Sequence, residues 1–213
     1  MRILNLYAGV GGNRALWPRE HQVTAVEYDP IIASAYADLY PQDEVIVADA
    51  HDYLLHHHQD YDFIWSSPPC QSHSRMRYHL GVKAKGFAPQ YPDFRLYEEI
   101  TLLSVEREGP WVVENVLPWY EPLIPAKQLN RHLYWSNFSL SEVPKATEKL
   151  RKAQIPELQK LHGISLDKYR IPNKRQVLRN MVPPAVGESI LNDAVAAISQ
   201  PVPISPQQAE ALF

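Results

Sequence analysis

The chain has 213 residues, of which 45% are hydrophobic and 21% are charged, and its formal net charge is -3. This length suits one domain with a sizeable core, and no apolar run is long enough to span a membrane. The N-terminus runs into glycines rather than a signal-peptide cleavage site, and the single cysteine, Cys70, excludes an internal disulfide framework and a cysteine-based zinc cluster. We therefore expect a cytoplasmic globular protein.

Six apolar runs typical of β-strands occur at residues 2–7, 22–28, 44–49, 61–66, 110–115 and 132–138. Helical patterns alternate with the first five, one capped by Asp29 and one by Asp93, whose inward-facing positions are Leu96, Ile100, Leu103 and Val105. A last helix begins at the prolines 183 and 184. The alternation predicts an α/β fold, a mostly parallel sheet with helices on both faces. Residues 1–198 form one domain in this interpretation, and 199–213 form an extended or poorly ordered tail.

Positive charge is concentrated in two stretches, although the net charge is negative. Five Lys or Arg residues and one acid lie between His73 and Arg95, and ten Lys or Arg residues and three acids lie between Lys145 and Arg179. Such segregation indicates a nucleic-acid-binding face, although two solvated basic loops would give the same pattern.

Ligand-suited residues follow the first three strands. Gly9, Gly11 and Gly12 follow the first, where glycines let the backbone turn sharply and approach a ligand, although Arg14 replaces the third glycine of a dinucleotide fingerprint. Glu27 ends the second strand and suits two ribose hydroxyls, and Asp49 ends the third and suits an adenine amino group. The three strand ends together indicate an adenosine-containing cofactor, while each acid alone is equally a helix N-cap.

The next two strands deliver a thiol and a carboxyl group. Cys70 follows the fourth strand in "SPPCQ", and Glu114 lies in "VENV" of the fifth. Carboxyl ends of neighbouring parallel strands meet at the crevice where such sheets place their chemistry. A thiolate beside a carboxylic acid suits attack on an electron-poor ring whose nitrogen is protonated. Taken singly, Cys70 would be a buried small hydrophobe and Glu114 a satisfied core acid.

These motifs resemble those of the cytosine-5 DNA methyltransferases, in the order of that family and over nearly the whole chain. The similar segments are "LNLYAGVGGNRALW", "VEYD", "VADAHDYL", "PPCQSHS", "VVENV", "NRHLYWSNF", "LQKLHGI" and "RNMVPPAVGESI". The resemblance implies a Rossmann-like fold that binds S-adenosylmethionine. It also implies methylation of cytosine carbon 5 in DNA, with the base flipped out of the duplex or single-stranded.

The resemblance assigns roles to individual residues. Cys70 attacks the cytosine ring, Glu114 protonates it and Asn115 braces the loop of the nucleophile. The implied S-adenosylmethionine contacts are Tyr7, Ala8, Gly9, Gly11, Gly12, Glu27, Tyr28, Asp49, Ala50, Pro69, Asn180 and Val182. The implied nucleic-acid contacts are Gln71, Ser72, Ser74, Arg75 and Arg77.

Two departures from the family pattern stand out. His132 occupies the position of the arginine that contacts the cytosine carbonyl, with Arg131 one place earlier. Either His132 makes that contact, or a local shift lets Arg131 make it. Strand alternation leads us to expect that His132 faces the cytosine and Arg131 faces a phosphate or solvent. Only 18 residues separate Phe138 from Glu157, where the family has a target-recognition domain, so residues 139–172 form a short basic insert. We therefore expect low sequence specificity, as in the core of a bacterial or phage-encoded enzyme. There are two alternatives. The chain methylates an RNA such as tRNA, or it is a non-catalytic core that needs a separate specificity subunit.

Three consecutive histidines at 56–58 invite a metal interpretation. Adjacent histidines on a helix point in different directions and do not share one ion. We assign no metal, and interpret the run as a solvated helix end.

Overall fold

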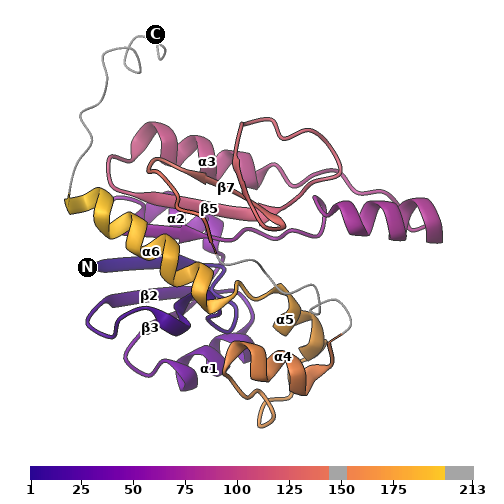
Figure 1. The fold of residues 1–213 in the computed structure, drawn as a ribbon, viewed down its shortest axis with the longest axis horizontal. Helices are drawn as coiled ribbons and strands as arrows, with labels where there is room; N and C mark the ends of the chain where they lie inside the picture. The colour runs from indigo at the N-terminus through magenta and orange to yellow at the C-terminus, as the bar shows by residue number, and fades with distance from the viewer. Residues whose placement is uncertain (144–152, 200–213) are drawn as a thin grey trace.

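The computed structural model describes residues 1–143 and 153–199, and within them the chain forms one seven-stranded sheet (Figure 1). The strand order is β3-β2-β1-β4-β5-β7-β6. The strands are β1 (Arg2–Leu6), β2 (Gln22–Glu27), β3 (Glu44–Val47), β4 (Phe63–Ser66), β5 (Trp111–Val116), β6 (Lys127–Leu129) and β7 (His132–Ser136). β1 to β5 are parallel, while β7 is antiparallel to both β5 and β6. All six predicted strands are present, each with ends within two residues of the predicted ones. The three residues of β6 were missed because so short an edge strand has no usable periodicity.

Helices cover both faces of the sheet, as the sequence pattern predicts (Figure 1). The helices are α1 (Pro30–Leu39), α2 (Ala50–His57), α3 (Arg95–Glu106), α4 (Ile155–His162), α5 (Lys174–Asn180) and α6 (Pro184–Ser199), with a 3-10 turn η1 (Asn13–Leu16) and a π-helix η2 (Arg77–Lys83). α2 and α3 pack on one face, and α1 and α6 pack on the other. α4 and α5 pack against α1 rather than against the sheet.

Alternating side chains of the strands build two apolar cores. Ile3, Phe63 and Trp65 point toward α6 and are fully buried. Leu4 and Ile64, on the opposite face, are fully buried against α2 and α3. Burial of apolar surface at about 25 cal/mol per Å² stabilises this three-layer arrangement.

The N-cap residue of α1 is the one predicted, whereas the cap of α3 is one residue later than expected. The Asp29 carboxylate accepts hydrogen bonds from the N–H groups of Ile31 and Ile32 at the start of α1. At α3 the cap is Phe94, not Asp93, although the Asp93 carboxylate still accepts a bond from the Arg95 N–H. Val105 does not face inward as expected, because it lies in the last turn of α3 and is 66% exposed.

The five parallel strands all end at one edge of the sheet, and β7 starts there. His132, the first residue of β7, pairs with Val116, the last residue of β5. This edge therefore collects the residues that follow β1 to β5 together with those that open β7. The tail beyond residue 199 and residues 144–152 of the insert lie outside the described residues, so the domain boundaries stay a prediction. No helix within the described residues is long and apolar enough to cross a membrane.

Candidate active site

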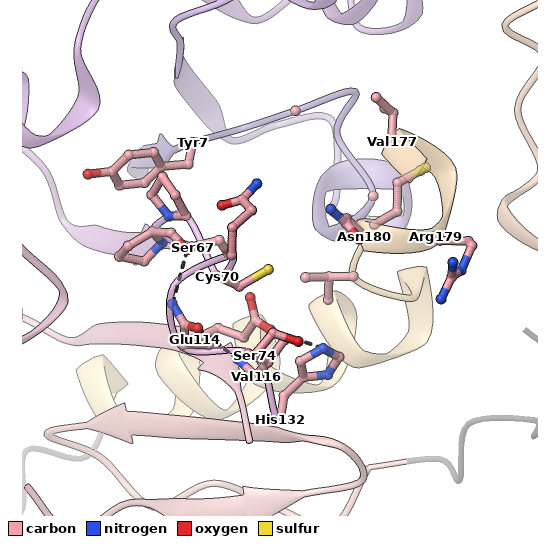
Figure 2. A pocket seen from close by; sticks show the side chains of 18 of the residues that line it. Tyr7, Ser67, Cys70, Ser74, Glu114, Val116, His132, Val177, Arg179 and Asn180 are labelled. Carbon is pink, nitrogen blue, oxygen red and sulfur yellow. Dashed lines mark hydrogen bonds and ion pairs between the residues drawn. The ribbon is translucent and has the colours of Figure 1, made fainter. Parts of the chain in front are cut away.

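A cavity of about 1040 Å³ opens at this edge of the sheet. Residues after β1 to β5 and at the start of β7 form one side, and α5 with the segment that follows it forms the other (Figure 2). All of the site residues expected from the sequence line it except Gly11, Ser72 and Arg77. Sequence positions that are more than 100 residues apart therefore meet in one place.

Two glycines after β1 shape the floor of the cavity. Gly9 has a positive φ of 56°, its N–H donates to the Glu27 carboxylate at 2.9 Å, and the space where a Cβ would stand is open. Gly12 lies so close to the segment after α5 that a Cβ there would stand 2.5 Å from the Val182 carbonyl oxygen. The loop thus needs glycine both for its turn and for its contact with the opposite wall. Gly11 faces away from the cavity, and its carbonyl accepts a bond from Tyr40.

Arg14, which replaces the third fingerprint glycine, serves the fold rather than a ligand. Its guanidinium group forms a two-pronged ion pair with Asp43 at 2.7 and 2.9 Å, and both side chains are almost fully buried. Burial alone would lower the pKa of Arg14, but its hydrogen bond and ion pair with Asp43 raise it. The pair ties the loop after β1 to the loop before β3.

Glu27 and Asp49 stand at the ends of two adjacent strands. Besides holding Gly9, the Glu27 carboxylate accepts the N–H of Asp29 at 2.9 Å. One Asp49 oxygen caps α2 by accepting the N–H groups of His51 and Asp52, and the other pairs with Arg95 at 3.3 Å. The N-cap interpretation of Asp49 is therefore correct, and any ligand contact is additional to it.

Two tyrosines flank the same end of the cavity. Tyr28 is 76% exposed at its rim, whereas Tyr7 lies in its wall with a positive φ of 55°, a conformation that is rare for any residue but glycine. The Tyr7 hydroxyl donates to Glu99 at 2.5 Å. Burial, and then the charge of Glu99, raises the pKa of Tyr7 far above its ordinary value, so the ring is held as a neutral donor.

Glu99 is the centre of a buried polar network that the sequence reading missed. It is 1% exposed and also accepts from Ser66 Oγ at 2.6 Å, while the His51 ring nitrogen lies 3.1 Å away. The signal was present in the sequence, because position 99 shares a helix face with the apolar positions 96, 100 and 103. An acid on an inward face needs partners, and here those partners stand at the ends of β1 and β4.

Bonds between two loops fix the backbone around Cys70. The Asn115 side-chain amide donates to the Pro68 carbonyl at 3.0 Å, as the predicted bracing role requires. The Cys70 carbonyl accepts the N–H groups of His73 and Ser74, and Ser74 pairs with Pro118 in an isolated β-bridge. The loop after β4 therefore rests on the loop after β5.

Cys70, Glu114 and His132 come together in the cavity (Figure 2). Burial, and after it the negative charge of Glu114, raises the pKa of the Cys70 thiol to about 11, so the sulfur is protonated at neutral pH. The Glu114 carboxylate is 3.5 Å from His132 Nε2. This contact follows from the register, since Val116 pairs with His132 and Glu114 lies two residues back on the same face. Arg131, one residue before the strand, is exposed at the cavity rim.

Three of the five expected nucleic-acid contacts line the cavity, and the other two lie elsewhere. Gln71, Ser74 and Arg75 line the cavity. Ser72 instead holds the loop, since its hydroxyl accepts the Asp93 N–H at 3.0 Å, and Arg77 lies just outside the cavity in η2. Other lining residues that sequence reasoning did not single out are Met76, His79, Arg95, Asn173 and Gln176.

The run of three histidines is explained by local bonds. His56 and His58 contact backbone carbonyls of α2, and His57 pairs with Asp60 at 2.9 Å. Among the described residues no group of three or more His, Cys, Asp or Glu side chains is arranged to hold a metal ion.

Residues 1–88, which include the glycine loop, Glu27, Asp49 and Cys70, match the family model of the C-5 cytosine-specific DNA methylases. The matched residues make up less than half of the chain. No curated protein matches the chain. The solved methyltransferase EhMeth of Entamoeba histolytica is 12% identical and shares the fold, with a TM-score of 0.56 over 93% of this chain and 98% of that one.

Two further solved structures are similar at lower TM-scores. A putative DNA modification methyltransferase encoded within an Escherichia coli prophage is 23% identical over 55% of this chain and 32% of that one, with a TM-score of 0.37. DNMT2 of Spodoptera frugiperda is 23% identical over 54% of this chain and 35% of that one, with a TM-score of 0.38. The chain thus spans about a third of the length of each. The family-model match over residues 1–88 and the shared fold both point to a methyltransferase that uses S-adenosylmethionine.

The end of the cavity between β1 and β3 fits that cofactor chemically. Two carboxylates on adjacent strand ends accept bonds from hydroxyl and amino groups, and Glu27 has lone pairs to spare beyond its two backbone bonds. The open space at Gly9 lets a ligand reach the backbone. Aromatic rings at Tyr7 and Tyr28 offer faces to a purine.

Proposed function

We propose that the chain methylates carbon 5 of cytosine in DNA through a covalent adduct with Cys70. The observation that carries the proposal is the meeting of Cys70, Glu114 and His132 in the cavity whose other end fits the cofactor. A non-catalytic role would not require a thiol and a carboxyl group to share that position.

The residues divide the chemistry between them. Cys70 gives its proton to water as its sulfur bonds to carbon 6 of the ring, and Glu114 in its protonated form donates to nitrogen 3, so that the adduct is neutral. Bound S-adenosylmethionine supplies an electrophilic methyl group for carbon 5. Transfer of the carbon-5 proton to water then restores the ring double bond and breaks the bond between sulfur and carbon 6, which releases Cys70 as a thiolate, while nitrogen 3 returns its proton to Glu114.

The electrostatics of the site suit this order of events. A charged Glu114 opposes ionisation of Cys70, so a protonated Glu114 favours thiolate formation as well as donation to the ring. His132 faces the same point from β7 and is placed to donate a hydrogen bond to the cytosine carbonyl. The Cys70 thiol stays protonated until a cytosine occupies the pocket, and this limits the side reactions of the thiol.

Glu27 and Asp49 hold the ribose and the adenine amino group in this proposal, with the segment Asn180–Val182 as the opposite wall. Arg75 and Arg131 at the rim, with Arg77 beside it, contact phosphates. Because only 18 residues separate Phe138 from Glu157, few side chains remain to read base edges, and the intrinsic sequence specificity is low.

A covalent trap tests the proposal. DNA that contains 5-fluorocytosine, incubated with the purified chain and S-adenosylmethionine, should yield a denaturation-resistant adduct, because fluorine does not leave carbon 5 as a proton does. Cys70→Ala should give no adduct and no turnover while its calorimetric affinity for S-adenosylmethionine is unchanged. Methylation of cytosine by the alanine variant would refute the mechanism.

Sequencing the methylation pattern of DNA treated with the purified chain tests the specificity. We expect methylated cytosines in many contexts without any added protein. Activity that appears only when a second protein from the source cell is added would mean that a partner chain supplies recognition.

A further inference from the structure

Residues 76–94, referred to below as the arm, leave the cavity and return to it. Met76 and His79 line the cavity at the start of the arm, and Asp93 lines it at the end. Between them η2 carries the chain away from the sheet, and Figure 1 shows this magenta helix projecting beyond the strands. A polymer whose target base sits in the cavity therefore passes the arm with its neighbouring nucleotides.

The arm is held in place at its base. The Tyr78 ring stacks on Trp119 with centroids 4.4 Å apart and planes 9° apart, and Lys83 Nζ lies 5.4 Å from the centroid of the Tyr78 ring. Farther along, the Phe87 N–H donates to the Gly81 carbonyl at 3.0 Å, and the Phe87 ring lies against Gly81. These contacts order the arm without covering its outer surface.

Several large apolar side chains are exposed on that outer surface. The exposed large apolar side chains are Met76 (43%), Leu80 (51%), Phe87 (52%), Tyr91 (96%) and Phe94 (54%). They lie within 19 consecutive residues and next to the catalytic cavity. Isolated exposed apolar residues need no explanation, but such a concentration marks an interaction surface.

The charge of the same segment indicates what the surface binds. Arg75, Arg77, Lys83, Lys85 and Arg95 lie in or beside the arm, and Asp93 is its one acid. The Asp93 carboxylate already accepts the Arg95 N–H. Two arms facing each other in a dimer would bring like charges together, whereas a polyanion would be attracted. Exposed aromatic rings among cations are the combination that binds single-stranded nucleic acid, because bases stack on the rings while the cations neutralise phosphates.

We propose that the arm is a stacking surface for unpaired nucleotides beside the target cytosine, and that single-stranded DNA is the preferred substrate class. This inference rests on the proposed function, which places a cytosine in the cavity. Phe87 and Tyr91 are the stacking residues, and Lys83 and Lys85 contact the phosphates of the same strand. A duplex has its base faces covered and offers these rings nothing to stack on.

Fluorescence anisotropy with a labelled 12-nucleotide DNA strand tests the proposal, with the same strand in a duplex for comparison. We expect the wild-type chain to bind the single strand at least about tenfold more tightly than the duplex. The double variant Phe87→Ala/Tyr91→Ala should weaken single-strand binding by at least roughly 30-fold, because each of the two lost base stacks contributes about 5- to 150-fold. It should leave duplex binding and the slope of log K against log salt unchanged. Tyr91→Phe is the matched control, since it keeps the ring.

Lys83→Ala separates the two kinds of contact. Loss of one phosphate contact should lower the salt slope for the single strand by about 0.7, while the double aromatic variant does not change it. Equal affinity for single strand and duplex, or a double variant that binds like wild type, would overturn the inference. Sedimentation that shows a dimer in the wild type and a monomer in the double variant would also overturn it, because the arm would then bind a second copy.

Methyl transfer assays distinguish this failure from failure of the proposed function. If single strands bind through the arm but no cytosine is methylated, the proposed function fails and the stacking surface stands. If single-stranded and duplex DNA are methylated at equal rates regardless of the arm variants, the function stands and the inference fails. Tighter binding and faster methylation of an RNA strand of the same sequence would refute DNA as the substrate.

Discussion

The two ends of the cavity are built in different ways. At the cofactor end Glu27 is fixed by bonds to residues nearby in the chain or on the next strand, since its carboxylate holds Gly9 and Asp29, although Tyr7 and Asp49 also contact α3. At the nucleophile end the fixing bonds run between distant loops, as when Asn115 holds Pro68 and the Trp119 indole donates to the Ser72 carbonyl. The glycine loop with Glu27 is therefore a property of local strand-turn-helix units, while the nucleophile end exists only once β4, β5 and β7 have assembled.

This difference has a functional consequence. A rigid cofactor end keeps its geometry when a nucleic acid binds, whereas the nucleophile loop depends on a few contacts that closure over a substrate can rearrange. Changes at one end should then leave the other end largely intact, and each of the following predictions tests that separation.

The largest effect is expected from Glu114→Gln. Loss of the proton donor to the ring should lower turnover by roughly 10²- to 10⁴-fold, with affinity for S-adenosylmethionine unchanged. The same variant removes the charge that helps to raise the pKa of Cys70 to about 11, so that pKa should fall. Iodoacetamide labelling followed by mass spectrometry between pH 7 and 11 measures this directly, because Cys70 is the single cysteine. Labelling no faster than in wild type would mean that Glu114 lies too far from the thiol for the proposed roles.

Whereas Glu114→Gln mainly lowers turnover, Glu27→Ala should mainly lower the affinity for S-adenosylmethionine. It removes charge-assisted bonds to the ligand and the two backbone bonds that hold the loop, which together weaken S-adenosylmethionine binding by about 1.5 to 3 kcal/mol, or roughly 10- to 150-fold in Kd. Calorimetry measures the affinity, with Asp52→Ala, outside the cavity on α2, as the control. Unchanged affinity in a folded Glu27→Ala variant would place the ligand elsewhere.

Glu99 joins the two ends, because it contacts Tyr7 after β1, Ser66 before the nucleophile loop and His51 in α2. Glu99→Gln should destabilise the fold by about 1 to 3 kcal/mol, since a buried amide is a poorer partner for these groups. It should also weaken S-adenosylmethionine binding through Tyr7. Denaturant unfolding and calorimetry measure the two effects, and Glu106→Gln, exposed in the last turn of the same helix, is the control. Equal changes in cofactor affinity and in Cys70 labelling would show that the ends are coupled.

The same network predicts a pH dependence. The hydrogen bond to Glu99 raises the pKa of His51, against the opposing effect of burial. The stability from this pair is complete below the unfolded pKa near 6.5 and is lost as the pH rises through the higher folded value. The difference in unfolding free energy between wild type and Glu99→Gln should therefore be larger at pH 5.5 than at pH 8.5. His21, His73 and His162, whose pKa values are lowered by burial, act in the opposite direction but cancel in this difference. A difference that grows with pH would exclude the His51–Glu99 pair as its source.

The sequence predicted the cofactor end better than the nucleophile end, because local contacts can be read from the sequence and contacts between distant loops cannot. Gly9, Glu27 and Asp49 are local signals at strand ends, and a parallel sheet necessarily gathers them. Cys70 and Glu114 also followed from strand order. The partners of Glu99, the Trp119–Tyr78 stack and the return of the arm at Asp93 did not, because they depend on which distant segments pack together. β6 was missed for another reason, since three residues are too few to show a strand periodicity.

The last and smallest effects concern the pair at the start of β7. His132 lies 3.5 Å from Glu114, and Arg131 is exposed at the cavity rim, so strand alternation separates their tasks. His132→Ala removes one neutral hydrogen bond to the cytosine carbonyl, about 0.5 to 1.5 kcal/mol, and should lower kcat roughly 2- to 12-fold without changing cofactor affinity. His132→Gln keeps a donor near the same position and should recover part of the rate, which a merely structural loss would not. Arg131→Ala should leave kcat intact and lower the salt slope of duplex binding by about 0.9, as expected for one phosphate contact. If kcat is instead lost in the Arg131 variant and kept in the His132 variant, then β7 shifts by one residue when nucleic acid binds. The nucleophile end would in that case rearrange around its substrate.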